Sequence, residues 1–240
     1  MTRIGLALYT VRDDAARDLE GTLRAVAGIG YEGVELHRLD GHDPVRVRAW
    51  LDEAGLAVSS RHASLEAIET QLPGLAAEAH AIGWRRLVLA WLDPSGLEDP
   101  SWPSRLARAA EAAAGHGLEL GYHNHDAEVR TGFLDRLPPE LFAEVDLGWA
   151  WWAGADPVEV LDRLHGRVPL VHVKDFRDRG RDPGSFAPVG DGVIDYARVA
   201  PAAVGAGVDW LLVEQDHCEG PALEAAARSF AALTRMAGTT

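Results

Sequence analysis

Cysteine is nearly absent from this sequence: Cys218 is the only one among 240 residues. A single cysteine excludes an intramolecular disulfide and suits a reducing compartment. No apolar run approaches the roughly 20 residues that a membrane-spanning helix requires. The first ten residues, MTRIGLALYT, have too short an apolar stretch for a secretory signal and no small-residue cleavage site. We therefore expect a cytoplasmic protein with no membrane partner.

Basic residues are also scarce, with 23 Lys and Arg against 37 Asp and Glu, and the formal net charge is -14. Binding to a nucleic-acid backbone needs a basic stripe, so we expect no nucleic-acid partner. There is no P-loop, and the turn after the first predicted strand, YTVRDDA, has no glycine. Because a glycine-rich first turn is typical of open dinucleotide-binding sheets, that architecture is the weaker alternative.

Short β-rich segments alternate with amphipathic helical segments along the whole chain. The predicted strands are Ile4–Tyr9, YEGVELH, LAVSSRH, RRLVLAW, LELGYHN, LFAEVDL, VPLVHVKD and VDWLLVEQD. The predicted helices are Asp14–Ile29, Pro44–Ala54, Leu65–Ile82, Pro103–Gly115, Asp156–Leu164 and Pro221–Met236. Eight strands separated by helices, with no linker between them, predict an α/β fold, a single (β/α)8 barrel that spans residues 1–240 as one domain.

Polar side chains gather at the carboxyl ends of nearly all predicted strands, whereas the opposite ends lack them. In a (β/α)8 barrel the carboxyl ends form the active-site face, so this asymmetry predicts a functional site there. The strand-end residues are Tyr9, Glu35, His37, His62, Trp91, Asp93, His123, His125, Asp146, His172, Lys174, Asp175, Glu214 and Asp216.

Four of these residues predict a metal site: His123, Asp146, His172 and Glu214 end the fifth to eighth strands. Imidazole and carboxylate ligands from adjacent strands suit one divalent ion, namely Mn, Co, Mg or Zn. The alternative is that each residue is a hydrogen-bonded strand end. Taken singly each fits that alternative better, but together they favour a metal.

With these residues in place, the sequence resembles the xylose-isomerase-like barrel superfamily, in its sugar phosphate isomerase/epimerase branch, which includes inosose dehydratase. The resemblance covers nearly the whole chain, and the order and spacing of the segments are specific for the branch but not for a substrate. The matching segments are ALYTVRDD, GYEGVEL, GYHNHDAE, VDLGWAWWAGADP, PLVHVKD, VGDGVIDY and VEQD.

The resemblance implies a metal held by Glu, Asp, His and Glu, the last three at Asp146, His172 and Glu214. The first ligand departs from this pattern because His123 stands where the family has glutamate, and His125 or Glu128 are alternatives. The resemblance also implies a small-molecule sugar or polyol substrate and a homo-oligomer. The ketose epimerases of the family use two metal-bound glutamates, so a histidine here changes that symmetric proton exchange.

The chemistry expected of such a site is proton abstraction next to a carbonyl through a metal-stabilised enediolate. Glu214 is the first candidate for the base, with Glu128 and Lys174 next. Lys174 could instead hold a phosphate, stabilise the enediolate oxygen or form a salt bridge. Candidate substrate-binding residues are Tyr9, Glu35, His62, His125, Trp149 and Asp175, with structural alternatives for Glu35 (a carboxylate paired with Arg12 or Arg61), His62 and Trp149 (packing at the rim).

We therefore expect a metal-dependent isomerase or epimerase of a sugar or sugar derivative. A dehydratase of a keto-sugar or keto-inositol is the nearest alternative, because the same enediolate can expel a β-hydroxyl group. A non-catalytic carbohydrate-binding barrel and a nuclease that cuts DNA at abasic sites are alternatives of other classes. The glycine-rich segment after the seventh strand, RDRGRDPGSFAPVGDG, is expected to form a lid over the site.

Overall fold

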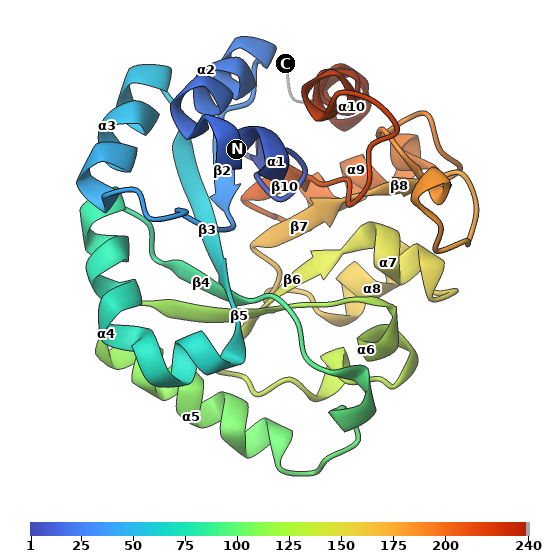
Figure 1. The fold of residues 1–240 in the computed structure, drawn as a ribbon. Helices are drawn as coiled ribbons and strands as arrows, with labels where there is room; N and C mark the ends of the chain where they lie inside the picture. Colours follow the sequence, from blue (N-terminus) through green and yellow to red (C-terminus); the bar gives the residue numbers. More distant parts are fainter. Residues whose placement is uncertain (239–240) are drawn as a thin grey trace.

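A closed barrel of eight parallel strands forms the centre of the molecule, with helices around it (Figure 1). The computed structural model describes residues 1–238. Strand β1 pairs with both β2 and β10, which closes the barrel and confirms the predicted (β/α)8 architecture. The strands are β1 (Arg3–Ala7), β2 (Gly33–Leu36), β3 (Ala57–Ala63), β4 (Arg86–Leu89), β5 (Glu119–His123), β6 (Phe142–Asp146), β7 (Leu170–Val173) and β10 (Trp210–Val213).

The helices follow the predicted pattern, with differences at four places. The predicted helix Asp14–Ile29 is two helices, because Asp18 has a non-helical backbone and its side chain caps the second. Helices α6, α7 and α9 were not predicted. The helices are α1 (Arg12–Arg17), α2 (Leu19–Ile29), α3 (Pro44–Ala54), α4 (Leu65–Ile82), α5 (Trp102–Gly115), α6 (Asp126–Arg130), α7 (Leu147–Trp152), α8 (Pro157–Arg163), α9 (Tyr196–Gly205) and α10 (Ala222–Ala237).

Helix α4 illustrates how local sequence sets the helix ends. The Ser64 side chain accepts a hydrogen bond from the backbone N–H of Ala67, which satisfies one of the free donors at the start. Gly83 follows the helix with φ of 90°, a conformation that glycine adopts without strain. Along the helix, Ile68, Leu72 and Leu75 are buried, so its apolar stripe packs against the barrel.

Apolar side chains seal the amino-terminal end of the barrel interior. Val88, Leu170, Trp210 and Leu212 form a separate buried cluster there. Gly33 makes room for it, because a Cβ at this position would lie 2.5 Å from the Trp210 ring. The polar interior is therefore confined to the carboxyl-terminal end of the strands, where active sites of this fold lie.

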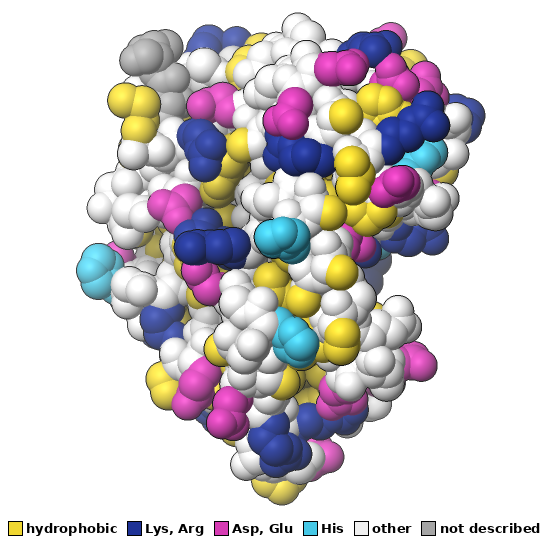
Figure 2. Space-filling model, turned by 90° about the vertical axis from the view of Figure 1, so that its left-hand side faces the viewer, with side chains coloured by type: hydrophobic (Ala, Val, Ile, Leu, Met, Phe, Trp, Pro, Cys, Tyr) yellow, Lys and Arg dark blue, Asp and Glu magenta, His cyan; other side chains and the backbone are white. Residues whose placement is uncertain are grey.

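The surface carries both signs of charge. On the side covered by α3 and α4, basic and acidic side chains are interspersed (Figure 2). Within residues 1–238, none of the helices combines the length and apolarity needed to cross a membrane.

The segment after β7 is ordered by Asp175, which had been predicted to bind substrate. Its carboxylate accepts four backbone N–H bonds, from Phe176, Gly190, Gly192 and Ile194, at 2.9 to 3.2 Å. The same segment forms a two-stranded antiparallel sheet of β8 (Asp175–Phe176) and β9 (Phe186–Ala187). This carboxylate faces the loop rather than the barrel interior, so the geometry gives it a structural role instead of the predicted one.

Removing this carboxylate should destabilise the protein. We expect Asp175→Ala to lower the free energy of unfolding by roughly 3 kcal/mol, because buried backbone donors would lose their acceptor. Asp178→Ala is the matched control, since the exposed Asp178 accepts one backbone bond, from Gly180. Urea denaturation of both variants measures the difference, and equal losses would contradict the structural role of Asp175.

Candidate metal centre and active site

The side-chain alternation of the strands directs successive polar residues into the barrel. Residues two apart on a strand point to the same face, so Glu144 and Asp146 of β6 both point inward and both are fully buried. His172 and Lys174 follow the same rule at the end of β7, and both are also buried. The barrel mouth thus contains two layers of polar side chains, one deeper than the other.

The four predicted metal ligands come together in the upper layer. One nitrogen or oxygen atom from each of His123, Asp146, His172 and Glu214 lies within 4.8 Å of the others. His172 Nδ1 is 3.0 Å from Glu214 Oε2 and 3.9 Å from Asp146 Oδ2, while His123 Nε2 is 3.5 Å from Asp146 Oδ2. Two imidazoles and two carboxylates at these separations form a donor set suited to a divalent transition metal.

Two buried atoms of this quartet support a metal site directly. His123 Nδ1 lies 3.3 Å from the carbonyl oxygen of Ala90, to which it donates, so its Nε2 carries a free lone pair. Neither His123 Nε2 nor Asp146 Oδ2 has a hydrogen-bond partner among the described residues. Burial and the neighbouring His172 lower the pKa of His123, which favours the neutral ring that a metal requires. Asp146 Oδ2 has Lys174 Nζ 3.2 Å away as an ion-pair partner, so His123 Nε2 is the atom left without a partner. Buried polar atoms of that kind are rare, and an ion beside His123 and Asp146 would supply the missing contact.

Glu35 orients His172 from below. Its Oε1 lies 2.8 Å from His172 Nε2, and an acceptor on one ring nitrogen leaves the other free to bind a metal. Burial by itself lowers the pKa of His172, but Glu144, Glu35 and Glu214 outweigh it and raise the pKa well above the ordinary value. The negative field that favours a proton on His172 also attracts a divalent cation.

Lys174 is the only lysine in the chain, and it is buried beside the quartet. Its Nζ lies 2.7 Å from Asp216, 2.8 Å from Glu214 and 3.2 Å from Asp146. Burial by itself raises the pKa of Asp146, but Lys174 outweighs it, and the pKa falls to about 2. Burial lowers the pKa of Lys174, yet the three carboxylates raise it well above the ordinary value. Lys174 is therefore a fixed cation at the site.

A second cluster, Glu35, His62, Glu144 and His172, forms the deeper layer. His62 Nε2 lies 2.6 Å from Glu144 and 3.1 Å from Glu35. Burial lowers the pKa of His62, but these carboxylates outweigh it and raise the pKa to about 10. Burial and the charge of Glu35 raise the pKa of Glu144 to about 7. Glu35 and His62, predicted to bind substrate, are thus engaged with one another beneath the quartet.

Sequence reasoning missed Glu144 and Asn124. Glu144 lies inside β6 rather than at its end, but its spacing of two from Asp146 was a usable signal. Asn124 accepts a hydrogen bond from the backbone N–H of Asp146 through its Oδ1, at 3.0 Å, and is fully buried. It therefore fixes the position of Asp146 relative to the end of β5.

Glu128 does not face the site, although it had been predicted as a base or ligand. The Tyr122 hydroxyl donates to its Oε1 at 2.7 Å, and the backbone N–H of His125 donates to its Oε2 at 3.0 Å. One carboxylate oxygen thus caps the start of α6, and the other accepts from Tyr122. This geometry favours a structural role for Glu128 over the predicted one, and Glu214 stays the first candidate for the base.

We therefore expect Glu128→Gln to cost about 1 kcal/mol of stability, because an amide replaces one of the two acceptors. Its catalytic rate should change only slightly. Urea denaturation and a proton-exchange assay measure the two effects. A fall in rate of roughly a hundredfold or more, as expected on loss of a general base, would reinstate Glu128 as a catalytic residue.

The remaining predicted substrate contacts lie around the mouth. Trp149 is 6% exposed, and its ring centroid is 5.1 Å from Lys174 Nζ and 5.7 Å from the His125 ring. Trp149 Nε1 and His125 Nδ1 have no hydrogen-bond partner among residues 1–238. Tyr9 stands on the rim, 5.0 Å from the ring of His37. These groups leave donors and ring faces for a substrate above the quartet.

Side-chain contacts fix the segment after β7 that was predicted to form a lid. Arg181 donates to both oxygens of Asp126 at 2.8 Å, and its guanidinium lies 4.3 Å from the Trp152 ring centroid. The Arg177 guanidinium donates to the carbonyl oxygens of Gly184 and Phe186. The Arg181 contacts hold the loop beside α6 and α7, and the Arg177 contacts join two parts of the loop to each other.

Comparison with known proteins agrees with this architecture. Residues 23–236 match the family described as "Xylose isomerase-like TIM barrel", which confirms the resemblance predicted from the sequence. The inosose dehydratase of Geobacillus kaustophilus (strain HTA426) is 27% identical over 269 aligned positions, which cover 90% of this chain and 87% of that protein.

Two solved structures share the fold over almost their whole length. A sugar phosphate isomerase/epimerase from Parabacteroides distasonis ATCC 8503 has a TM-score of 0.77 and 22% identity, covering 99% of this chain and 94% of that one. A probable 3-DHS dehydratase from Bacillus anthracis has a TM-score of 0.79 and 16% identity, covering 97% and 99%. At these identities the likeness shows the barrel alone.

Proposed function

The chain belongs to the xylose isomerase-like TIM barrel family, and we propose that it is a divalent-metal-dependent enzyme that removes a proton next to a carbonyl group of a sugar or polyol derivative. The observation that carries this proposal is the buried quartet, in which His123 Nε2 has no hydrogen-bond partner among residues 1–238. The named relatives are enzymes, which supports catalysis over a binding role.

His123, Asp146, His172 and Glu214 would hold the ion. When bound, a divalent ion supplies Lewis-acid charge next to the substrate oxygens. Lys174 adds a fixed positive charge on the same side, because its Nζ lies 2.8 Å from Glu214 and 3.2 Å from Asp146. The positive charge held by the quartet and that of Lys174 would together stabilise the negative charge that develops on a carbonyl oxygen when its neighbouring carbon loses a proton.

Glu214 is the base in this proposal. At 6% exposure it is the quartet member most accessible from the mouth, against 3% or less for the other three. Burial raises the pKa of Glu214, but Lys174 and His172 outweigh it and lower the pKa well below the ordinary value. The side chain therefore remains a carboxylate, the form that accepts a proton.

A site with Glu214 as its single base favours isomerisation over epimerisation. An isomerase can move a proton between neighbouring carbons on one face with a single carboxylate, whereas epimerisation needs a proton donor on the opposite face. Where the related epimerases carry a second glutamate, this site has His123. We therefore propose isomerisation as the first candidate and epimerisation as the weaker one.

Dehydration is the second candidate, and the similarity to inosose dehydratase over 90% of the chain favours it. Proton removal by Glu214 would then be followed by loss of a β-hydroxyl group. The proton that Glu214 takes up would leave with that oxygen as water. Lys174, a fixed cation 2.8 Å from Glu214, would stabilise the negative charge on the departing oxygen.

One experiment separates the two candidates. The protein is incubated with Mn²⁺ and a keto-inositol or a ketohexose in deuterated water, and the mixture is followed by NMR and mass spectrometry. Exchange of a carbon-bound proton is expected in either case. A product with the composition of the substrate minus one water identifies dehydration, and an isomeric product identifies isomerisation. Absence of exchange with all such ketones would contradict the proposal.

A further inference from the structure

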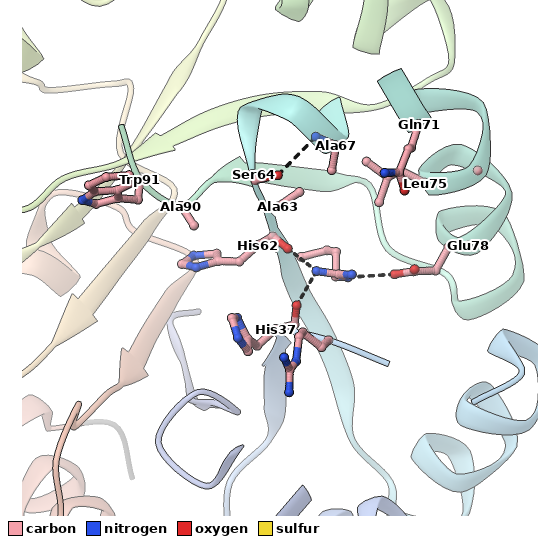
Figure 3. Close-up of a pocket in the computed structure, with 13 residues that line it drawn as sticks. His37, His62, Ala63, Ser64, Ala67, Gln71, Leu75, Glu78, Ala90 and Trp91 are labelled. Atoms are coloured by element: carbon pink, nitrogen blue, oxygen red, sulfur yellow. Dashed lines mark hydrogen bonds and ion pairs between the residues drawn. The ribbon is translucent and has the colours of Figure 1, made fainter. Parts of the chain in front are cut away.

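A hollow of about 540 Å³ lies beside the candidate metal centre, and the proposed function does not account for it. It lies between α4 and the ends of β2, β3 and β4. Figure 3 shows Trp91, Ala90 and the ring of His62 at one end, with Gln71 and Leu75 of α4 at the other. Its volume falls within the range of small-molecule sites, roughly 300–1,000 Å³.

The hollow shares walls with the metal centre. His62 lines it and also contacts Glu35 and Glu144 of the deeper layer. Ala90 lines it as well, and its carbonyl oxygen lies 3.3 Å from His123 Nδ1. His62 and Ala90 therefore contact both the hollow and the polar groups of the metal centre.

Small and apolar residues form much of the lining. Ala63, Ala67, Gly74 and Leu75 leave an open apolar wall along α4 and the end of β3. Trp91 closes the other end. It is 53% exposed, and few large hydrophobic side chains in residues 1–238 are as exposed as this. An exposed indole face beside an active site is suited to stacking against a ring.

The charged groups of the hollow are already paired. Arg61 donates to Glu78 at 2.9 Å and to the backbone carbonyls of His37 and His62. Arg38 is paired with Asp40 at 3.1 Å. A phosphate group would have to break these pairs, so the lining favours an uncharged occupant.

We propose that the hollow receives an uncharged ring, aromatic or sugar, that the substrate carries as a second substituent. This inference rests on the proposed function, because the reacting carbonyl must reach the quartet while the ring stacks on Trp91. The substrate class is then a ring-substituted sugar or polyol, such as a glycoside, rather than a bare monosaccharide or a sugar phosphate.

Binding of unreactive glycosides tests this inference without turnover. Isothermal titration compares methyl β-D-glucopyranoside, phenyl β-D-glucopyranoside and cellobiose on the wild type. We expect the phenyl compound, cellobiose or both to bind about tenfold more tightly than the methyl compound, which is the size of one stacked ring contact. The phenyl and cellobiose arms distinguish an aromatic ring from a second sugar.

Two variants locate the effect. Trp91→Ala removes the stacking face and Ala67→Trp fills the hollow, and each should abolish the preference while leaving methyl glucoside binding unchanged. Val45→Ala, an exposed apolar residue of α3 outside the hollow, is the matched control and should keep the preference.

Equal affinities for the three glycosides, no binding of any of them, or a preference that survives both variants would each overturn the inference. Its failure is distinguishable from failure of the proposed function. Proton exchange on a small cyclic ketone without any ring preference would refute only the ring-binding role of the hollow. A ring preference in a protein that exchanges no proton would refute only the catalytic proposal.

Discussion

Glu214→Gln is expected to slow carbon-bound proton exchange by roughly a thousandfold, within the 10²–10⁴-fold that a general base contributes. The amide cannot accept the proton, although its size matches the carboxylate. The rate should stay low when Mn²⁺ is saturating, because the loss is of the base and not only of metal affinity. The rate of deuterium incorporation, measured over a range of Mn²⁺ concentrations, separates loss of the base from loss of metal affinity.

Glu219→Gln is the matched control for this change. Glu219 follows the same strand but pairs with Arg177 at the surface, at 3.1 Å. Its substitution should leave the exchange rate unaltered. If Glu214→Gln retained a rate within tenfold of the wild type at saturating Mn²⁺, the base would have to be another group, and Lys174 would be the next candidate.

Lys174→Met should destabilise the metal-free protein by about 3–5 kcal/mol, the cost of removing one partner from a buried ionic group. Asp146, Glu214 and Asp216 would then face one another with no cation among them. An added divalent ion should restore much of the loss, because it returns positive charge to the same carboxylates. Urea denaturation with chelator and with Mn²⁺ measures both effects.

Arg177→Met is the control, since the Arg177–Glu219 pair is exposed and such pairs contribute about 1 kcal/mol or less. We expect a large loss for Lys174→Met in chelator and a clearly smaller one with metal. Equal losses in the two conditions would show that the ion does not bind near Lys174. Because the chain has one lysine, lysine labelled with ¹⁵N only at Nζ also gives a single side-chain NMR signal from the site.

The barrel and the quartet could be predicted because each depends on a repeated local pattern. Each ligand follows an apolar strand, and parallel strands bring their carboxyl ends to the same face. His123, Asp146, His172 and Glu214 are therefore brought together by topology alone. Whether His123 replaces the family glutamate as a ligand remains a prediction that the metal measurement below tests.

Two residues were misinterpreted because their immediate neighbours determine where they point. Asp175 follows Lys174 directly, so it points to the opposite side, where backbone N–H groups of the loop surround it. Glu128 is the third residue after His125, the spacing of a capping box, and Tyr122 takes its other oxygen. Both spacings are visible in the sequence. They were overlooked because an acidic residue next to a predicted site was interpreted as functional.

The deeper layer could not be predicted in the same way. His62 and Glu35 were identified as strand-end residues, yet their contact with Glu144 depends on how far each strand is staggered in the closed barrel. The hollow beside Trp91 likewise depends on the distance between α4 and the ends of three strands. Such distances come from packing of the whole barrel, which no local pattern specifies.

The most direct test is the metal content of protein purified without chelator or nickel affinity, with Asp146→Asn, His123→Ala and Glu128→Gln measured beside the wild type. We expect about one divalent ion per chain in the wild type and in Glu128→Gln. The ion should be lost from the other two variants. A wild type that holds no ion after incubation with Mn²⁺, Co²⁺, Zn²⁺ or Mg²⁺, or an ion that all variants retain, would contradict the proposed metal centre.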